Sequence, residues 1–252
     1  MSFLDAGSSQ PLNPAGQRAL LQALTDGWAD PARLHAEGRK SQLLAEEAHQ
    51  TIAEVLAVRR DELHILSSGT TAVHSAVRGL NHARRREQSR VVVGAVEHSS
   101  VINATRSLDN AETTLLPVDS MGLVNAAELE ALLTSDGARL VAVQSVNQET
   151  GIQQDTEVIA GLCQAHAVPY LVDAAQSVGR AEIPQQWDVL TASAHKWGGP
   201  AGVGLLVIRT GVPWHPMDAT HTLGVSGQGF PNIPALMAAA ASLVQADQDQ
   251  RE

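Results

Sequence analysis

Cysteine, basic residues and long apolar runs are all scarce in this sequence of 252 residues. Its single cysteine, Cys163, cannot form a disulfide within the chain and excludes a metal site built from several cysteines. No apolar stretch reaches the roughly 18 residues that a membrane-spanning helix needs. The N-terminus, MSFLDAGSSQ, lacks the basic region and apolar run that are typical of a secretion signal. We therefore expect a cytoplasmic protein without a membrane partner.

Positive charge is also in short supply. Lys and Arg number 17 against 27 Asp and Glu, which gives a formal net charge of −10. Binding to nucleic acid or to an anionic membrane needs clustered Lys and Arg, so neither partner is expected. The one basic run, Arg84, Arg85 and Arg86, lies between a helical pattern and a strand. It is interpreted as a solvated turn, with a binding patch as the less favoured alternative.

Several common catalytic and cofactor-binding motifs are missing. The sequence has no G-x-x-x-x-G-K-[ST] phosphate loop and no G-x-S-x-G nucleophile turn. Its glycines at 198, 199, 202 and 204 do not spell G-x-G-x-x-G, and they precede a strand, which disfavours a nicotinamide-dinucleotide site. None of the ten histidines has H-E-x-x-H or other ligand spacing, so no metal is expected.

What the sequence does contain is an alternation of strand-like and helix-like patterns. Hydrophobic residues make up 44% of it, enough to bury a core. Strands are predicted over residues 62–68, 90–96, 113–119, 138–146, 168–175, 187–194 and 203–209. Helices are predicted over residues 40–58, 70–80, from about 99, 125–135 and 155–167, with an Ala-rich helix running to the C-terminus. Nearly continuous apolar strands joined by helices indicate an α/β fold with a mostly parallel sheet covered on both faces.

Polar side chains that could carry chemistry follow the predicted strands. Residues 68–71 begin a helix, whose exposed N–H groups and two threonine hydroxyls suit a phosphate. The others are Glu97 and His98, Asn147 and Gln148, Asp173 and Gln176, and Ser193, His195 and Lys196. Ligands bind beyond the carboxyl ends of parallel strands, so we expect these side chains at one rim. Lys196 stands out because glycines follow it closely, at 198, 199 and 202, which a solvated surface lysine does not need.

This set resembles the fold-type-I pyridoxal-phosphate (PLP) enzymes, and more narrowly the class V aminotransferase and cysteine desulfurase family. The matching stretches are SSGTTAVHSAVRGL, VEHSSVINA, VNQETGIQQD, LVDAAQSVGR and SAHKWGGPAGVGLLVIR, with LDAGSSQPLNP and LHAEGRK near the N-terminus. They cover about residues 3 to 245. The resemblance implies a PLP-dependent transferase-like large domain with a mostly parallel seven-stranded sheet. It divides the chain into an N-terminal helical segment (1–58), the PLP-binding α/β domain (59–230) and a C-terminal helix (231–252) that leads to a missing small domain.

The resemblance also assigns roles to residues. Lys196 would be the Schiff-base lysine, which binds PLP as an imine and shuttles the proton at the substrate α-carbon. Asp173 would keep the pyridine nitrogen protonated, and His98 would stack on the ring, so these three are the predicted catalytic residues. The remaining predicted cofactor contacts are Gly69, Thr70, Thr71, Ser193 and His195 at the phosphate, and Gln176 with either Asn147 or Gln148 at the phenolic oxygen. Plain helix capping is the alternative for Thr70 and Thr71, and an ordinary polar position is the alternative for His98 and Gln176.

Two departures from the family bear on function. The chain ends before the domain that, in relatives, supplies an arginine for the substrate carboxylate and, in desulfurases, a nucleophilic cysteine; Arg209 lies on the last long strand. Cys163, on a helix that covers the sheet, is interpreted as a packed residue and not as that nucleophile. The segment VSGQGFPNIPA has Val225 and Gln228 where the family has an arginine and a threonine that reach the partner subunit's phosphate. We also expect the apolar face of PALMAAAASLV to be exposed or buried in an oligomer contact.

The resulting hypothesis is a PLP-dependent enzyme that acts on a small amino acid. It is most like a cysteine desulfurase, which converts L-cysteine to alanine plus sulfur, and it is expected to form a homodimer with a sulfur-acceptor protein as a further partner. One alternative is a truncated non-catalytic chain or a half-enzyme that needs a separate C-terminal domain. Another is a class V aminotransferase or a different PLP lyase.

Overall fold

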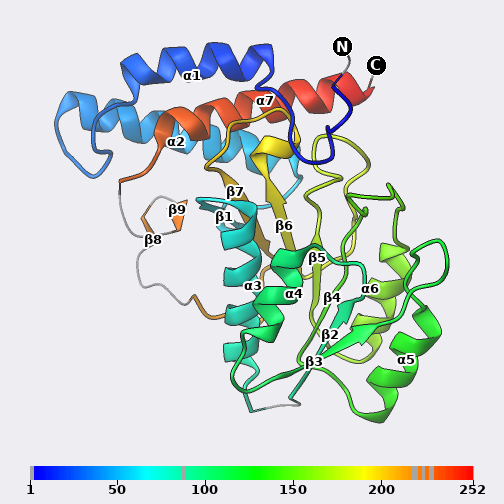
Figure 1. The fold of residues 1–252 in the computed structure, drawn as a ribbon. Coiled ribbons are helices and arrows are strands. Elements are labelled where there is room, and N and C mark those ends of the chain that lie inside the picture. Colours follow the sequence, from blue (N-terminus) through cyan, green and yellow to red (C-terminus); the bar gives the residue numbers. More distant parts are fainter. Residues whose placement is uncertain (1–2, 87–88, 217–220, 223–224, 227–229, 252) are drawn as a thin grey trace.

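One mixed sheet forms the centre of the molecule (Figure 1). The computed structural model describes residues 3–86, 89–216, 221–222, 225–226 and 230–251. Its strands are β1 (Leu63–Leu66), β2 (Arg90–Gly94), β3 (Glu112–Leu116), β4 (Leu140–Ala142), β5 (Tyr170–Asp173), β6 (Val189–Ser193), β7 (Gly204–Ile208), β8 (His221–Thr222) and β9 (Val225–Ser226). Its helices are α1 (Pro14–Asp26), α2 (Ala36–Val55), α3 (Gly69–Ala83), α4 (Ser99–Arg106), α5 (Ala126–Ser135), α6 (Thr156–Ala165) and α7 (Ile233–Arg251), with the 3-10 turns η1 (Arg60–Glu62) and η2 (Ala194–Lys196).

The strand order is β3-β2-β4-β5-β6-β7-β1-β9-β8. Pairing is parallel from β3 through β6, whereas β7 runs antiparallel to both β6 and β1. The two-residue strands β8 and β9 extend the edge beyond β1. The predicted α/β fold with a mostly parallel seven-stranded sheet is confirmed for β1 to β7. The prediction for Gln228 lies outside the described residues.

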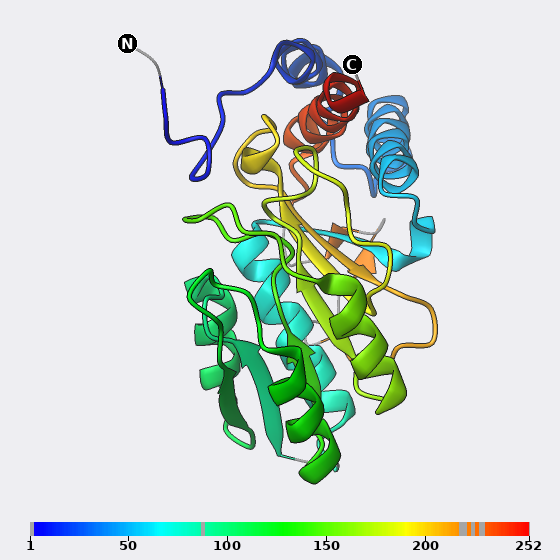
Figure 2. The same ribbon diagram turned by 90° about the vertical axis from the view of Figure 1, so that its right-hand side faces the viewer.

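Helices cover both faces of this sheet (Figure 2). The consecutive valines of β2 show why, because side chains alternate between the two faces of a strand. Val91 and Val93 pack with α3 and α4, while Val92 packs in the cluster that includes residues of α2, α5, α6 and α7. All three are fully buried, so the continuous apolar run of a strand corresponds to burial on both sides.

Two of the predicted helices, α3 and α5, show how sequence defines a buried face and a cap. Val73, Val77 and Leu80 of α3 are buried on one face, because residues three or four positions apart share one side of a helix. Asn125 caps α5, and its side-chain oxygen accepts hydrogen bonds from the backbone N–H groups of Ala127 and Glu128. Such features can be predicted from sequence because the cap and the buried face of a helix depend on residues that lie within one or two turns of each other.

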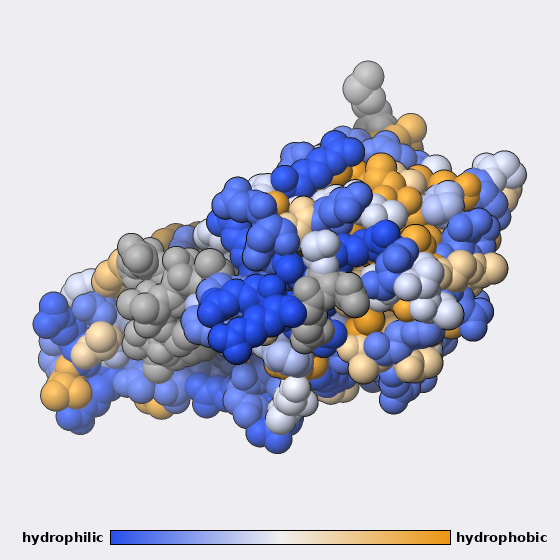
Figure 3. Space-filling model, turned by 90° about the horizontal axis from the view of Figure 1, so that it is seen from below, coloured by the Kyte–Doolittle hydropathy of each residue, from blue (hydrophilic) through white to orange (hydrophobic). Residues whose placement is uncertain are grey.

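The prediction for the C-terminal helix is wrong. Its apolar face is neither exposed nor left for an oligomer contact, because α1 and α2 from the opposite end of the sequence pack against α7 (Figure 1). Leu236 and Leu243 are buried, and Asn13 at the start of α1 donates to the carbonyl of Ser242 at 3.0 Å. Exposed apolar side chains lie on α1 instead, at Leu21 and Leu24. Hydrophilic residues predominate at the other end of the molecule (Figure 3).

Shortening Leu243 should therefore destabilise the fold. The side chain is completely buried, so Leu243→Ala leaves a cavity and is expected to lower the free energy of unfolding by about 2–5 kcal/mol. Leu24→Ala on α1 is the matched control, because Leu24 is 57% exposed and its loss should change stability by roughly 0.5 kcal/mol or less. Urea denaturation of the two variants measures both values. Equal stabilities would mean that α7 does not pack on α1 and α2 in solution.

Candidate active site

The carboxyl ends of the parallel strands surround a cavity of about 340 Å³. Its walls come from the loops after β1, β2, β4, β5 and β6 and from the N-terminal segment. The lining residues are Ser8, Ser68, Gly69, Thr70, Val73, His98, Ser100, Gln144, Val146, Gln148, Asp173, Ala175, Gln176, Ser193, His195 and Lys196. Nine of the eleven predicted site residues are in this set; Thr71 and Asn147 are not. The parallel topology thus brings together residues that are more than 100 positions apart in the sequence.

One end of the cavity is the start of α3. Ser68 is the N-cap, and its Oγ accepts a hydrogen bond from the Thr71 N–H at 3.0 Å. The Thr71 hydroxyl lies 2.9 Å from the same Oγ, so it completes the cap, and Thr71 is not among the lining residues. The first N–H groups of a helix, here those of Gly69 and Thr70, have no partner within the helix. Both residues line the cavity, so this helix start offers it an anion site.

Ser193 closes this end from the sheet side. Its Oγ lies 2.9 Å from Nδ1 of His195. A Cβ placed on Gly69 would come within 2.8 Å of the Ser193 Cβ, so only glycine allows the helix start to approach β6 this closely. Burial lowers the pKa of His195, and the neighbouring cations Lys196 and Arg180 lower it further. A neutral ring and a hydroxyl therefore stand beside the helix N-terminus.

Asp173 ends β5 and lies beside the middle of the cavity. Its Oδ1 accepts hydrogen bonds from the Ala175 N–H at 3.1 Å and from the Thr191 hydroxyl at 3.3 Å. Burial raises the pKa of Asp173, while these hydrogen bonds and the nearby His98 and Lys196 partly offset the rise. A partly desolvated carboxylate of this kind is stabilised by a cationic partner.

His98 has two functions in the structure. It is the N-cap of α4, and its Nδ1 accepts from the Ser100 N–H at 3.1 Å and lies 2.7 Å from the Ser100 hydroxyl. Accepting at Nδ1 leaves the proton of the neutral ring on Nε2. The ring also lines the cavity. His98 therefore combines helix capping with a position at the site.

Lys196 follows β6 at the end of η2. Its Nζ donates to the carbonyl of Gly7 at 2.6 Å, and the Gln176 side-chain amide donates to the same oxygen at 2.7 Å. Burial lowers the pKa of Lys196, with a further lowering by the Arg180 cation and opposing contributions from nearby carboxylates. The chain then turns tightly after Trp197, where Gly198 has a φ of +76° that favours glycine.

The structure distinguishes the two amides that the sequence left open. Asn147 is buried, and its amide donates to the Val96 carbonyl at 3.0 Å. Its Oδ1 accepts from the backbone N–H groups of Glu149 and Thr150. Asn147 therefore shapes its own loop, while Gln148 lines the cavity.

Sequence reasoning missed several residues at the site. Ser8 and the Gly7 carbonyl come from an N-terminal segment that follows no strand, so strand ends gave no signal for them. Glu97 followed a predicted strand but received no role. It is buried, its Oε1 accepts from the Gln144 N–H at 2.6 Å, and its Oε2 has no hydrogen-bond partner. Burial raises the pKa of Glu97 well above its ordinary value, and the charge of Asp173 raises it further.

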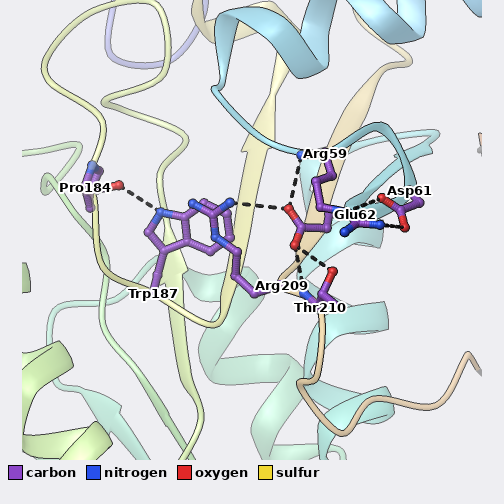
Figure 4. A network of polar contacts seen from close by, with 7 residues as sticks. All are labelled: Arg59, Asp61, Glu62, Pro184, Trp187, Arg209 and Thr210. Carbon is purple, nitrogen blue, oxygen red and sulfur yellow. Dashed lines mark hydrogen bonds and ion pairs between the residues drawn. The ribbon is translucent and has the colours of Figure 1, made fainter.

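Cys163 and Arg209 lie away from the cavity. Cys163 is buried on α6 against the sheet, and burial raises the pKa of its thiol to about 12. The packed interpretation is confirmed, since such a thiol is not a nucleophile at neutral pH. Arg209 lies at the opposite end of β6 from Lys196, where it stacks over Trp187 at 4.0 Å and pairs with Glu62 at 3.3 Å (Figure 4).

Two further features concern the described part of the chain. No helix there is long and apolar enough to cross a membrane. No group of three or more His, Cys, Asp or Glu side chains in these residues could hold a metal ion.

Comparison with known proteins agrees with this geometry. A family model described as Aminotransferase class-V matches residues 2–223. The cysteine desulfurase IscS of Vibrio vulnificus is 34% identical over 215 residues, which cover 82% of this chain and 53% of that protein. The mitochondrial cysteine desulfurase of Drosophila melanogaster is 32% identical, with 82% and 46% covered. A NifS/IcsS protein homolog of Lactobacillus delbrueckii subsp. bulgaricus is 30% identical, with 100% and 68% covered.

Solved structures show the same fold at lower identity. A NIFS-like protein superposes with a TM-score of 0.91 at 24% identity, over 98% of this chain and 70% of that one. SspA in complex with cysteine superposes with a TM-score of 0.88 at 24% identity, over 97% and 72%. The chain thus spans about half to two thirds of the length of the curated relatives.

Proposed function

Because the chain belongs to the class V aminotransferase and cysteine desulfurase family, whose members depend on PLP, we propose that it is a PLP-dependent enzyme that acts on a small amino acid, most like a cysteine desulfurase. The observation that carries the proposal is the meeting of the Lys196 amine and the Asp173 carboxylate at one cavity that also contains the start of α3. SspA, a neighbour in fold, is described in complex with cysteine, which supports a small amino acid as substrate.

The residues around the cavity fit PLP in charge and chemistry. The N–H groups at the start of α3, with Thr70, Ser193 and His195, offer hydrogen bonds to a phosphate. Asp173, whose pKa is raised by burial, gains from a cation, so a protonated ring nitrogen beside it is favourable. His98 offers a flat ring, and Gln176 and Gln148 are the amides at hand for the phenolic oxygen.

In the proposed reaction, PLP supplies an electrophilic carbon for amines and a ring that withdraws electrons from the substrate α-carbon. Lys196 supplies the amine that binds the cofactor covalently and later carries the α-proton. The lowered pKa of Lys196 increases its neutral fraction, which is the form that attacks carbon or accepts a proton. Asp173 would hold a proton at the ring nitrogen of bound PLP, and His98, which lines the same cavity, would cover one face of the ring.

A second candidate is a PLP-binding half-enzyme completed by another polypeptide. The observation that favours it is the position of two residues: Cys163 is buried with its thiol pKa raised to about 12, and Arg209 is at the wrong end of β6. On this proposal, the thiol that accepts sulfur comes from outside these 252 residues. Homodimer formation and a sulfur-acceptor protein are compatible with both candidates and remain proposals.

Turnover of L-cysteine distinguishes the two candidates. The PLP-loaded chain is incubated with L-cysteine and dithiothreitol, and alanine and sulfide are both quantified. For a desulfurase we expect equal amounts of alanine and sulfide. The two thiol groups of dithiothreitol reduce each sulfur atom removed from L-cysteine to sulfide, and they form one disulfide as they do so. A chain that binds PLP but leaves L-cysteine intact would overturn the desulfurase proposal and favour the half-enzyme. Pyruvate formation, or conversion of the cofactor to its amine form, would instead indicate a lyase or an aminotransferase.

A further inference from the structure

Arg180 joins three parts of the chain beside the candidate active site. It lies in the turn after β5 and is half-buried. Its Nε donates to the Lys196 carbonyl at 2.5 Å, and its Nη1 donates to Oε1 of Gln176 at 2.7 Å. Its Nη2 donates to the Ala6 carbonyl. One planar guanidinium thus bonds to η2, to its own turn and to the N-terminal segment.

A second set of hydrogen bonds connects the same parts of the chain. The Gly7 carbonyl accepts from Lys196 Nζ and from the Gln176 amide. Gln176 therefore links Arg180 to Gly7 with its two side-chain atoms, and the backbone and the amine of Lys196 are both held. Arg180 itself does not line the cavity, whereas Ser8, the neighbour of Gly7, does.

Packing fixes the turn that carries Arg180 against η2. Gly179 has a φ of +70°, and a Cβ there would come within 2.5 Å of the Trp197 Cβ. Trp197 is buried, and its Nε1 donates to the Ala239 carbonyl of α7 at 3.2 Å. The guanidinium is therefore presented to Lys196 by two elements that have little room to shift.

Electrostatics gives Arg180 a second effect. After burial, its positive charge is the largest influence that lowers the pKa of Lys196. Burial also lowers the pKa of Arg180, yet a guanidinium stays charged in any case. The charged or titratable groups around the Lys196 amine are Arg180 and His195, with Asp5, Glu149 and Asp173 acting in the opposite direction to Arg180, and His98 beside Asp173.

We propose that Arg180 is a positioning residue, which holds Lys196 and the N-terminal segment of residues 5–9 against the cavity and keeps the Lys196 amine reactive. The inference rests on the proposed role of Lys196 in binding PLP. It does not require PLP for its test, because the amine and the segment are both present in the cofactor-free chain.

The test uses the fact that Lys40 and Lys196 are the only lysines in the sequence. The cofactor-free chain is labelled with a trace of acetic anhydride across a pH series, and the two lysine peptides are quantified by mass spectrometry. In Arg180→Met, the midpoint of Lys196 labelling should move to higher pH by on the order of half a unit, since a nearby cation has been removed. Lys40, which is exposed and paired with Asp26, should not change.

Arg180→Lys separates charge from geometry. It keeps the cation but cannot reproduce the three-way fork, so the labelling midpoint should stay near that of the parent while residues 5–9 lose order. Hydrogen exchange of the Gln10 amide, which donates to the His195 carbonyl at 2.9 Å, should quicken in both variants. Faster exchange across the whole chain would indicate general destabilisation and overturn the proposal. So would an Arg180→Met variant with the parent's labelling profile and exchange.

Discussion

Lys196→Ala is expected to abolish covalent attachment of PLP and to lower any L-cysteine turnover by about a thousandfold or more. Alanine removes the only amine that lines the cavity among the described residues. The folded state loses a single hydrogen bond, from Nζ to the Gly7 carbonyl, so stability should fall by only about 0.5–1.5 kcal/mol. Borohydride reduction of the PLP-treated chain, followed by peptide mapping, measures the attachment directly.

Lys40→Ala is the matched control for this variant. Lys40 is exposed on α2 and pairs with Asp26 at 2.6 Å. It is not among the residues that line the cavity. Its replacement should leave the pyridoxyl label on Lys196 unchanged. A label that moves to Lys40, or a folded parent chain without any label, would contradict the proposed function. A label on Lys196 without turnover would retain PLP binding and favour the half-enzyme.

The sheet could be predicted because its strands are apolar on both faces. Runs such as RVVVG in β2 are buried whichever way each side chain points, and that continuity is visible in the sequence. The strands proved shorter than predicted. In residues 138–146, only Leu140–Ala142 is strand, although Val143 and Ser145 still donate to the carbonyls of Leu171 and Asp173. Regular strand pairing therefore ends at Ala142, just before Gln144 and Val146, which line the cavity.

Residue identity could be predicted at the site better than side-chain direction. Parallel strands bring their carboxyl ends together, and this placed Asp173 and Lys196 at one cavity as expected. Thr71 and Asn147 come from the same motifs, but nearby backbone and hydroxyl groups bind their polar atoms, and neither residue lines the cavity. Whether such a side chain lines the cavity depends on competition among nearby hydrogen-bond partners, and a sequence motif carries no information about that competition.

Contacts between the two ends of the sequence could not be predicted. Gly7 meets Lys196 across 189 positions, and Asn13 meets Ser242 across 229. Neither contact is accompanied by a repeating pattern or a fixed spacing in the sequence from which it could be predicted. The same lack of signal explains why the sequence predicts an apolar face of α7 that is exposed or buried in an oligomer contact, although α1 and α2 cover it.

Gly204→Ala is expected to lower the free energy of unfolding by about 3 kcal/mol or more and to weaken phosphate binding. Gly204 begins β7 between Leu66 of β1 and Ser193 of β6. A Cβ there would lie 2.1 Å from the carbonyl carbon and oxygen of Ser68 and 2.6 Å from the Gly69 nitrogen. These are backbone atoms at the start of α3, so they cannot yield by changing a rotamer. The substitution must move the helix start that forms the anion site.

Gly161→Ala provides the opposite case in the same chain. Gly161 is exposed on α6, and a Cβ there would meet nothing within 4 Å. Alanine removes the entropic cost of a helical glycine, so stability should rise by about 0.5–1 kcal/mol. Urea denaturation of both variants, with PLP titrated against each, compares them. If Gly204→Ala is as stable as the parent and binds PLP equally well, then β7 does not hold the start of α3 in place, and the anion site must depend on Ser193 and His195 instead.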